Sequence, residues 1–510
     1  MSTDTGGVAD FPSRVLILGL GETGLASALW CLRQNAALHI VDTRDNPPGL
    51  TALAEQGQGD ITHFLGDQAF SDAALDGVEQ IILSPGLAPS EPALAAFLEK
   101  AQQRQIPVIG EIELFARALT DLATTQGYRP QVLAITGTNG KTTVTSLTQA
   151  MLETAGKTAI AAGNISPSAL TALMQALDAQ ALPQVWVLEL SSFQMQTTTS
   201  LRPDAATVLN LTQDHLDWHR DMQEYAEAKA RLLAASPVAI VNRNDAAVVA
   251  MVEDINDVQV RSFGVDAPVL VGDTGMESAH GVTWITASEK DDFELPETPG
   301  ARRRKNADKP RRKPGLIKRL MPADAMQVRG QHNMLNAQAA MLLCRELGVG
   351  WGPMLITLRE FAAGMYRTQF ERSIRGVDFF NDSKGTNVGA TVAALDGMGR
   401  DIVLIAGGVG KGQDFSPLAA PVRRCARAVV LIGEAAAVIE QALAQTGVTC
   451  HRAESMDAAV RQALELAQQG DAVLMSPACS SFDMFKSYAH RGQVFSEAVH
   501  DLALDNGEVA

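Results

Sequence analysis

Short apolar runs recur along the whole chain, and most of them end in a turn that carries glycine, serine or an acidic residue. Such runs occupy residues 15–18, 81–83, 132–135, 185–190 and 205–211, and again 377–380, 402–406, 428–432 and 472–475. Apolar residues at helical spacing lie between them, as after Thr143 and in residues 224–235. Buried strands that alternate with helices predict an α/β protein with mostly parallel sheets.

The length of the chain predicts that these elements form about three domains. The chain has 510 residues, and a hydrophobic content of 46% is enough to build several cores. We expect a Rossmann-like N-terminal domain (1–110), a central P-loop, mononucleotide-binding α/β domain (111–364) and a Rossmann-like C-terminal domain (365–510).

Residues 291–321 break this globular pattern. They combine proline with the basic clusters at 302–305 and 309–313 and contain few large apolar side chains. This composition predicts a disordered, basic insertion on the surface of the central domain. A solvated linker is the default interpretation, and a weak contact with nucleic acid or another anionic surface is the alternative.

Charge and composition restrict the class of protein. A net charge of −16 argues against nucleic acid as the main partner. The chain has no run of about 18 apolar residues, which a membrane-spanning helix needs. Its first ten residues are polar and acidic, unlike a signal peptide, and its five scattered cysteines are typical of reduced thiols. We expect a cytoplasmic protein, with a monomer as the simplest assembly.

The first candidate site follows the apolar run 132–135 and reads Thr-Gly-Thr-Asn-Gly-Lys-Thr-Thr over residues 136–143. A glycine turn at the start of a helix directs backbone N–H groups and the positive end of the helix dipole at bound phosphates. Lys141 adds a full positive charge, and the Thr142 hydroxyl is placed to hold Mg²⁺. Gly137 and Gly140 are only three residues apart, so a chance glycine turn is the alternative to a phosphate-binding loop.

A second glycine-rich turn, at residues 19–24, reads Gly-Leu-Gly-Glu-Thr-Gly, and Asp42 follows about 20 residues later. Taken alone, this pattern is the dinucleotide fingerprint, so an NAD-dependent enzyme is the rival hypothesis. The motif itself requires only that the start of a helix faces a diphosphate. A UDP-sugar also offers one.

The remaining candidates lie between residues 185 and 230. Glu189 sits within a buried apolar run, where a carboxylate is costly unless it is paired or binds a metal ion. Asp214, His215, Asp217 and His219 could form a zinc site by composition alone. A single histidine beside Mg²⁺ is the favoured hypothesis, because no thiolate or His-Glu-x-x-His frame supports zinc. Lys229 lies in a largely apolar helical turn, and pairing with Asp214 or Glu227 would be its ordinary structural role.

Together these motifs resemble those of the Mur ligase family from Arg14 to about Phe495. The general ligase features are the loop at 136–143, Glu189 in Leu-Glu-Leu-Ser-Ser-Phe-Gln, His215, Lys229 and residues 330–333. Residues 19–24, 42–44, 84–86, 382–387 and 476–486 point to the D-glutamate-adding branch. So many matches in order exclude the NAD hypothesis.

The resemblance implies a ligase that uses ATP and Mg²⁺ to join D-glutamate to UDP-MurNAc-L-Ala through an acyl phosphate. Carried over by position, the UDP-sugar contacts fall on Gly21, Thr23, Asp42, Thr43, Arg44, Ser84, Gly86, Asn164, Ser191 and Gln194. The ATP contacts fall on Gly137, Thr138, Asn139, Gly140, Lys141, Thr142, Thr143, Asn336, Arg367 and Asp382. The D-glutamate contacts fall on Thr386, Lys411, Ser481, Ser487 and Tyr488. The implied catalytic residues are Lys141, Glu189, His215 and Lys229. Thr142 and Glu189 would hold one Mg²⁺, and His215 with a carbamylated Lys229 would hold a second.

The chain departs from the family at residues 364–369, where Gly-Met-Tyr-Arg-Thr-Gln stands for the family's Gly-x-Pro-His-Arg. Counting from Gly364 places Arg367 one position early, whereas counting back from Phe370 places Gln369 at the arginine position. Arg367 is the better candidate because of its charge.

Overall fold

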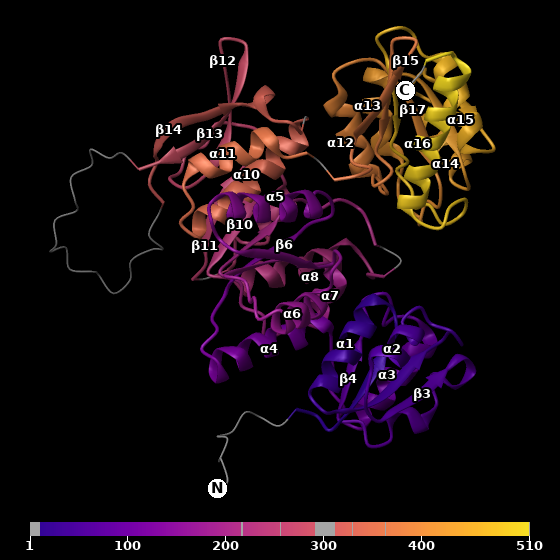
Figure 1. The fold of residues 1–510 in the computed structure, drawn as a ribbon. Coiled ribbons are helices and arrows are strands. Elements are labelled where there is room, and N and C mark those ends of the chain that lie inside the picture. Colours follow the sequence, from indigo (N-terminus) through magenta and orange to yellow (C-terminus); the bar gives the residue numbers. More distant parts are fainter. Residues whose placement is uncertain are drawn as a thin grey trace, which may run out of the picture.

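The computed structural model describes residues 11–215, 218–255, 257–290, 312–328, 330–362 and 364–508. Figure 1 shows three α/β bodies, with the central one between the N-terminal and the C-terminal one. In these described segments, no helix combines the length and the apolar character that crossing a membrane requires. The predicted fold class, three α/β domains with mostly parallel sheets, is confirmed.

The N-terminal body is a parallel five-stranded sheet in the order β3-β2-β1-β4-β5, which is the Rossmann strand order without its sixth strand. Its strands are β1 (Arg14–Leu18), β2 (Ala37–Asp42), β3 (Ile61–Leu65), β4 (Gln80–Leu83) and β5 (Val108–Ile109). Its helices are α1 (Glu22–Arg33), α2 (Leu50–Gln56) and α3 (Pro92–Gln103), with 3₁₀ turns η1 (Gly66–Gln68) and η2 (Asp72–Leu75). The glycine turn 19–21 connects β1 to α1 at the carboxyl edge of the sheet.

The central body is a parallel six-stranded sheet in the order β11-β10-β9-β6-β8-β7. Its strands are β6 (Gln131–Thr136), β7 (Ala159–Gly163), β8 (Val185–Glu189), β9 (Ala205–Val208), β10 (Val238–Asn242) and β11 (Gln259–Phe263). Its helices are α4 (Glu111–Thr125), α5 (Lys141–Thr154), α6 (Ala169–Asp178), α7 (Ser192–Gln196), α8 (Met222–Ala234), α9 (Ala246–Ala250), α10 (Gln331–Glu346) and α11 (Trp351–Glu360). β9 ends at Val208, so residues 209–211 of the predicted run form a loop at the site rather than strand.

A small antiparallel sheet, which the apolar pattern did not predict, extends the central body (Figure 1). It consists of β12 (Thr274–Ala279), β13 (Val282–Glu289) and β14 (Leu316–Pro322), followed by the 3₁₀ turn η3 (Ala323–Ala325). The prediction that residues 291–321 are disordered is therefore wrong for residues 316–321, which pair with β13. This edge strand has no alternating pattern, because residues 316–319 are all exposed and only Met321 is buried. Residues 291–311 lie outside the described segments.

The C-terminal body is a six-stranded sheet in the order β15-β16-β20-β17-β18-β19, with β15 antiparallel at one edge. Its strands are β15 (Gln369–Ile374), β16 (Val377–Asn381), β17 (Ile402–Gly407), β18 (Ala426–Ile432), β19 (Thr449–Arg452) and β20 (Ala472–Met475). Its helices are α12 (Val388–Met398), α13 (Ala419–Cys425), α14 (Ala436–Leu443), α15 (Met456–Leu466) and α16 (Tyr488–Asp505), with the 3₁₀ turn η4 (Ser416–Leu418).

Packing explains why these runs form strands and where the bodies meet. Every residue of β8 and of β17 is buried, as expected for central strands with helices on both faces. Between bodies, α1 packs on α4 and α6, and α10 packs on α12. These contacts place the carboxyl edge of the central sheet between the two outer bodies.

Candidate active site

The loop between β6 and α5 has the geometry of a phosphate-binding loop. Gly140 has φ +87°, and a Cβ at this position would lie 2.4 Å from Asn336 Oδ1. Both the backbone conformation and the lack of space therefore require glycine. Asn210 fixes the loop from the next strand, because its Oδ1 accepts from Asn139 N (2.8 Å) and its Nδ2 donates to Asn139 O (3.0 Å).

Lys141 folds back over this loop, and its Nζ donates to the carbonyl oxygens of Gly137 (2.9 Å) and Thr138 (3.0 Å). Burial lowers the pKa of Lys141, and the carboxylates of Glu189 and Asp214 oppose that shift. Thr142 and Thr143 follow in the first turn of α5. An ammonium group at the start of a helix, where the first N–H groups have no partner within the helix, is suited to bind an anion.

Glu189 ends β8 beside this loop and is 2% exposed. Its Oε1 accepts from Asn164 Nδ2 (3.0 Å), whereas its Oε2 is buried and has no hydrogen-bond partner among the described residues. A buried carboxylate oxygen with no partner among the described residues fits a hard divalent cation such as Mg²⁺.

Lys229 points from α8 at the underside of the same loop and is 1% exposed. Its Nζ donates to Thr136 Oγ1 (3.3 Å) and Gly137 O (3.1 Å) and lies 4.5 Å from the centre of the Tyr225 ring. Burial, together with the charge of Lys141, lowers the pKa of Lys229 well below its usual value. No carboxylate in the described segments lies within ion-pair distance of it, although the charge of Asp214 opposes the shift, so the alternative role of a lysine paired with Asp214 or Glu227 is not seen.

His215 lies in the loop after β9 in a left-handed conformation (φ 56°). Its Nε2 is 3.6 Å from Asp214 Oδ2, and its ring packs edge-on against Phe193. Burial and the charges of Lys141, Lys411 and Lys229 lower the pKa of His215, while Asp214 opposes the shift. A neutral imidazole can be a metal ligand.

The other residues considered for a zinc site either contact a different partner or lie outside the described segments. The Nε2 of His219 bonds Ser192 Oγ at 2.9 Å, and Asp217 is outside the described segments. Across the described part of the chain, no three His, Cys, Asp or Glu side chains are arranged to hold a metal ion.

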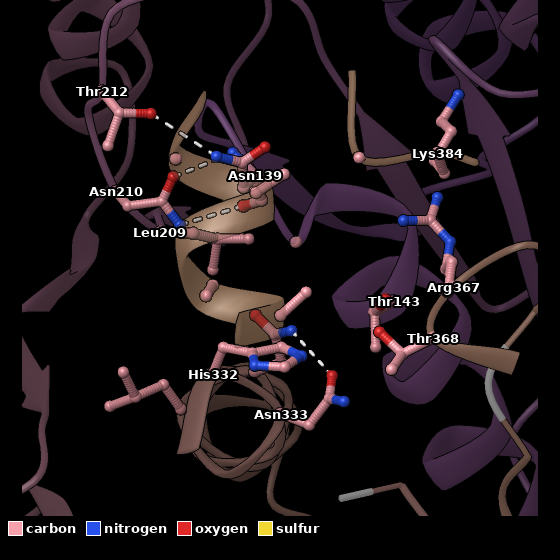
Figure 2. Close-up of a pocket in the computed structure, with 18 of the residues that line it drawn as sticks. Asn139, Thr143, Leu209, Asn210, Thr212, His332, Asn333, Arg367, Thr368 and Lys384 are labelled. Carbon is pink, nitrogen blue, oxygen red and sulfur yellow. Dashed lines mark hydrogen bonds between the residues drawn. The ribbon is translucent and has the colours of Figure 1, made fainter. Parts of the chain in front are cut away.

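A cavity of about 280 Å³ opens beside the loop, between the central and C-terminal bodies. Six of the predicted ATP residues line it: Asn139, Gly140, Thr143, Asn336, Arg367 and Asp382. Leu209, Phe263 and His332 add apolar and aromatic surface, which suits a purine ring. Figure 2 shows Arg367, Thr368 and Lys384 across this cavity from Asn210 and His332.

The C-terminal wall of the cavity carries a buried acid and two cations. Asp382 accepts from Thr368 N (3.0 Å) and Ser476 Oγ (2.7 Å), and burial raises its pKa to about 6. Lys384 lies 3.8 Å from the centre of the Tyr488 ring, and burial lowers its pKa to about 8. Of the two alternatives in the altered segment, Arg367 lines the cavity, whereas Gln369 begins β15 and accepts from Tyr366 N (3.1 Å).

The residues predicted to bind D-glutamate all lie in loops or at helix starts of the C-terminal body. Ser487 caps α16 by accepting from His490 N (3.1 Å), and Tyr488 packs under Lys384. Ser481 is 2% exposed, and Lys411 has φ 49° in the loop after β17. Thr386 follows Lys384 in the loop before α12.

The residues predicted to bind the UDP-sugar divide between two bodies. Asp42 accepts from Leu20 N (2.8 Å) and pairs with the Arg44 guanidinium (2.7 Å), while Ser84 Oγ donates to Gly19 O (2.8 Å). Gly21, Thr43 and Gly86 lie in the loops at these strand ends, and Thr23 lies in the first turn of α1. In the central body, Ser191 and Gln194 form a capping box at the start of α7, which gives both side chains a structural role. Glu22 accepts from Ser166 Oγ and so brings the start of α1 near Asn164.

Three residues at the site were missed by the sequence analysis. Asn387 bonds Asn139 across the boundary between bodies, Tyr225 bonds Thr138 Oγ1 (3.1 Å), and Arg491 lies fully buried in the C-terminal body. For Arg491 a signal was present, since it shares one helical face with Phe495, Val499 and Leu502. No signal in the sequence indicated the contact between Asn387 and Asn139, because it joins segments that are 248 residues apart.

Comparison with known proteins assigns the family. Three family models match: "Mur ligase MurD-like, N-terminal domain" (residues 13–110), "Mur ligase middle domain" (135–302) and "Mur ligase, glutamate ligase domain" (366–479). The UDP-N-acetylmuramoylalanine--D-glutamate ligase of Bordetella bronchiseptica is 60% identical over 97% of this chain and 98% of its own. Its namesake from Ralstonia nicotianae is 53% identical over 97% and 98%.

Solved structures share the fold at low identity. The MurF ligase from Thermotoga maritima, solved in complex with ADP, has a TM-score of 0.57 and 14% identity, covering 97% of this chain and 100% of its own. The UDP-N-acetylmuramate-alanine ligase MurC of the same organism has a TM-score of 0.55 and 16% identity, covering 96% and 99%. With domains, order and length all in agreement, the chain belongs to the Mur ligase family, in the branch of the UDP-N-acetylmuramoylalanine--D-glutamate ligases.

Proposed function

We propose that this protein is the ATP-dependent ligase that adds D-glutamate to UDP-N-acetylmuramoyl-L-alanine, with release of ADP and phosphate, in the synthesis of peptidoglycan precursors. The observation that carries the proposal is the cluster of Lys141, Glu189, His215 and Lys229 around the phosphate-binding loop. Asn139 and Gly140 of this loop line the cavity between the central and C-terminal bodies. The relatives that are 53% and 60% identical carry this activity in their names.

The arrangement supports a division of labour between the three bodies. Residues 1–110 would bind the UDP-sugar at the strand ends that carry Asp42 and Ser84. Residues 111–364 would bind ATP and perform the phosphoryl transfer, and residues 365–510 would bind D-glutamate and close over the nucleotide. Open α/β sheets bind ligands at such carboxyl edges.

Catalysis of this reaction depends on stabilising the charge of the transition states more than on covalent catalysis by the protein. The substrate carboxylate attacks the γ-phosphorus of ATP, which gives an acyl phosphate and ADP, and the D-glutamate amine then expels phosphate. Lys141 and the backbone N–H groups of its loop would stabilise the charge that develops on the phosphoryl oxygens. Arg367 and Lys384 face the same cavity and would add positive charge from the C-terminal side. Closure of the bodies would exclude water, which otherwise hydrolyses an acyl phosphate.

Mg²⁺ fits the residues present, because Glu189 Oε2 is buried with no hydrogen-bond partner in the described part of the chain, and burial lowers the pKa of His215 and so favours its neutral form. Thr142 and Glu189 would hold one ion, and His215 with Lys229 would hold a second. When bound, the metal ions neutralise phosphate charge and polarise the phosphoryl group for attack.

For Lys229 to join such a site, its amine must carry an acid group, and carbamylation supplies one. A buried lysine with a lowered pKa holds a free amine, whose nitrogen forms a bond to the carbon of CO₂ while a proton leaves. The carbamate offers two oxygen ligands suited to Mg²⁺. Incubation with ¹³C-labelled bicarbonate should give a carbamate carbon signal that Lys229→Ala lacks and that Lys100→Ala, at an exposed ion pair, retains. A signal that persists in Lys229→Ala would rule out this site.

The function is tested by measuring ADP release with UDP-MurNAc-L-Ala and a panel of D-glutamate, L-glutamate, L-alanine and meso-diaminopimelate. We expect release that depends on the nucleotide sugar and on D-glutamate alone. Release with another amino acid would identify a different ligase of the family, and no ATP consumption with any of them would refute the enzymatic assignment.

A further inference from the structure

The phosphate-binding loop and the C-terminal body are joined by a reciprocal amide pair. Asn387 Nδ2 donates to Asn139 Oδ1 (2.9 Å), and Asn139 Nδ2 donates to Asn387 Oδ1 (3.2 Å). Asn139 is the central residue of the phosphate-binding loop, whereas Asn387 precedes α12 and is 4% exposed. Two hydrogen bonds in opposite directions require the two amides to lie face to face, so the pair forms only in one relative placement of the bodies.

Two further contacts make this placement specific. Asn387 Nδ2 also donates to Asp214 Oδ2 (3.2 Å), the carboxylate beside His215. Two residues on, a Cβ at Gly389 would lie 2.8 Å from Thr212 Oγ1 and 3.3 Å from Asn139 Nδ2. The start of α12 therefore rests directly on the loops that carry the nucleotide and metal residues.

Asn387 also has a structural role within the C-terminal body, which must be distinguished from its contact with the central body. Its Oδ1 accepts from Ala390 N (2.9 Å), which makes it the N-cap of α12. Loss of the side chain would remove a helix cap as well as the contact between bodies. Oδ1 takes part in both roles, because it also accepts from Asn139 Nδ2, whereas the hydrogen bonds of the amide nitrogen Nδ2 go to Asn139 and Asp214 of the central body.

We propose that Asn387 is a positioning residue that couples the phosphate-binding loop to the docking of the C-terminal body. Its contact with Asn139 makes docking of the C-terminal body depend on the conformation of the phosphate-binding loop. Its contact with Asp214 makes docking depend also on the conformation of the loop that carries His215. In this role it acts through its contacts with Asn139 and Asp214. The proposal rests on the proposed function, since the nucleotide is what would set the shape of the loop.

Two substitutions of Asn387, Asn387→Asp and Asn387→Ser, remove its amide donor while they keep an oxygen that can cap α12. Asn387→Asp also sets a second carboxylate against Asp214, and Asn387→Ser adds no charge. The matched control is Ser455→Ala, which removes the cap of α15 (Ser455 Oγ accepts from Ala458 N at 3.1 Å) in the same body, away from the boundary. Thermal unfolding verifies that each variant is folded.

Two measurements decide the matter in the full-length protein. In steady-state kinetics we expect kcat to fall about 10–100-fold in Asn387→Asp and Asn387→Ser, as for the loss of one or two buried hydrogen bonds, with Ser455→Ala close to wild type. In small-angle X-ray scattering, ADP should reduce the radius of gyration of the wild type and of Ser455→Ala but not of the two Asn387 variants.

The outcomes separate the possibilities. Normal kcat and normal ADP-dependent compaction in folded Asn387→Ser would overturn the proposal, as would equal losses in Ser455→Ala. The scattering arm uses ADP alone, so it still tests the coupling if the amino-acid assay shows another substrate, and a failure of the proposed function is thereby distinguished from a failure of this inference.

Discussion

Replacing Arg491 with methionine should loosen two loops of the active site at once. Arg491 is fully buried in α16, and its guanidinium joins the loop after β16 to the loop after β20. It donates to Ser383 Oγ (3.1 Å), Ser383 O (2.9 Å) and Cys479 O (3.1 Å). Burial lowers its pKa to about 10, so it stays charged at neutral pH.

The size of the effect follows from these three bonds. A hydrogen bond to a charged group contributes about 1.5–3 kcal/mol, and a buried carbonyl left without its donor costs a further amount. Methionine has a similar reach and removes the cost of burying a charge, so the losses do not simply add. We expect the C-terminal body to lose about 3 kcal/mol, because breaking a buried charged network typically costs this much. For a body of this size that corresponds to a fall in Tm of roughly 6–12 °C.

Calorimetry and steady-state kinetics test this expectation. Ser383 lies between Asp382 and Lys384, so we also expect kcat to fall about 10–100-fold from misplacement of these groups. Arg461→Met is the matched control, because Arg461 is 44% exposed and pairs at the surface with Asp505 (2.7 Å). Its loss should cost less than about 1 kcal/mol. An Arg491→Met protein as stable and as active as Arg461→Met would refute the reasoning.

Three other perturbations give distinct readouts. Lys141→Ala should reduce ADP release about 10²–10³-fold, and near-normal release would show that the loop does not bind the transferred phosphate. Replacing residues 291–311 with a Gly/Ser linker should preserve kcat. Extending the replacement through β14 should destabilise the central body, because β14 pairs with β13. A large loss of kcat from the shorter replacement would contradict the first expectation. Burial raises the pKa of Asp382 to about 6, so its contribution to the free energy of unfolding is present below pH ~4 and is lost as the pH rises through 6. The stability difference between wild type and Asp382→Asn should change over that interval, and a difference that stays constant with pH would be the contrary result.

The buried parts of the fold could be predicted from the sequence because their strands are continuous apolar runs. β6, β8, β17 and β20 are of this kind, and each is a central strand with helices on both faces. Several of the strands that escaped prediction are edges, although the interior strands β10 and β13 escaped it too. β15, β19 and β14 have mixed polar and apolar residues, because one side of an edge strand faces solvent and the hydrogen bonds that fix it come from its neighbour.

The residues of the candidate site likewise differ in whether the sequence could predict them. Glu189 and Lys141 could be predicted because each is a charged residue placed where burial is costly, at the end of an apolar strand or in a glycine turn. The contact between Asn139 and Asn387 could not, because both amides are ordinary loop residues and their pairing depends on how two separate bodies meet. Local pattern predicts what each body contains, whereas side-chain pairing across the boundary is set by tertiary packing.

The altered segment at 364–369 shows how packing can preserve a site when a motif changes. Counted from Gly364, Tyr366 stands where the family has proline, and it adopts φ 62°, which is strained for a bulky residue. Its ring lies over Gly492 of α16, where a Cβ would come within 2.4 Å of the ring, and its carbonyl accepts from Lys384 N (3.1 Å). The glycine thus makes room for the tyrosine, and the contact offsets the strain. Because Tyr366 is anchored to the C-terminal body on both sides, Arg367 is held at the cavity without the proline that would otherwise stiffen the turn.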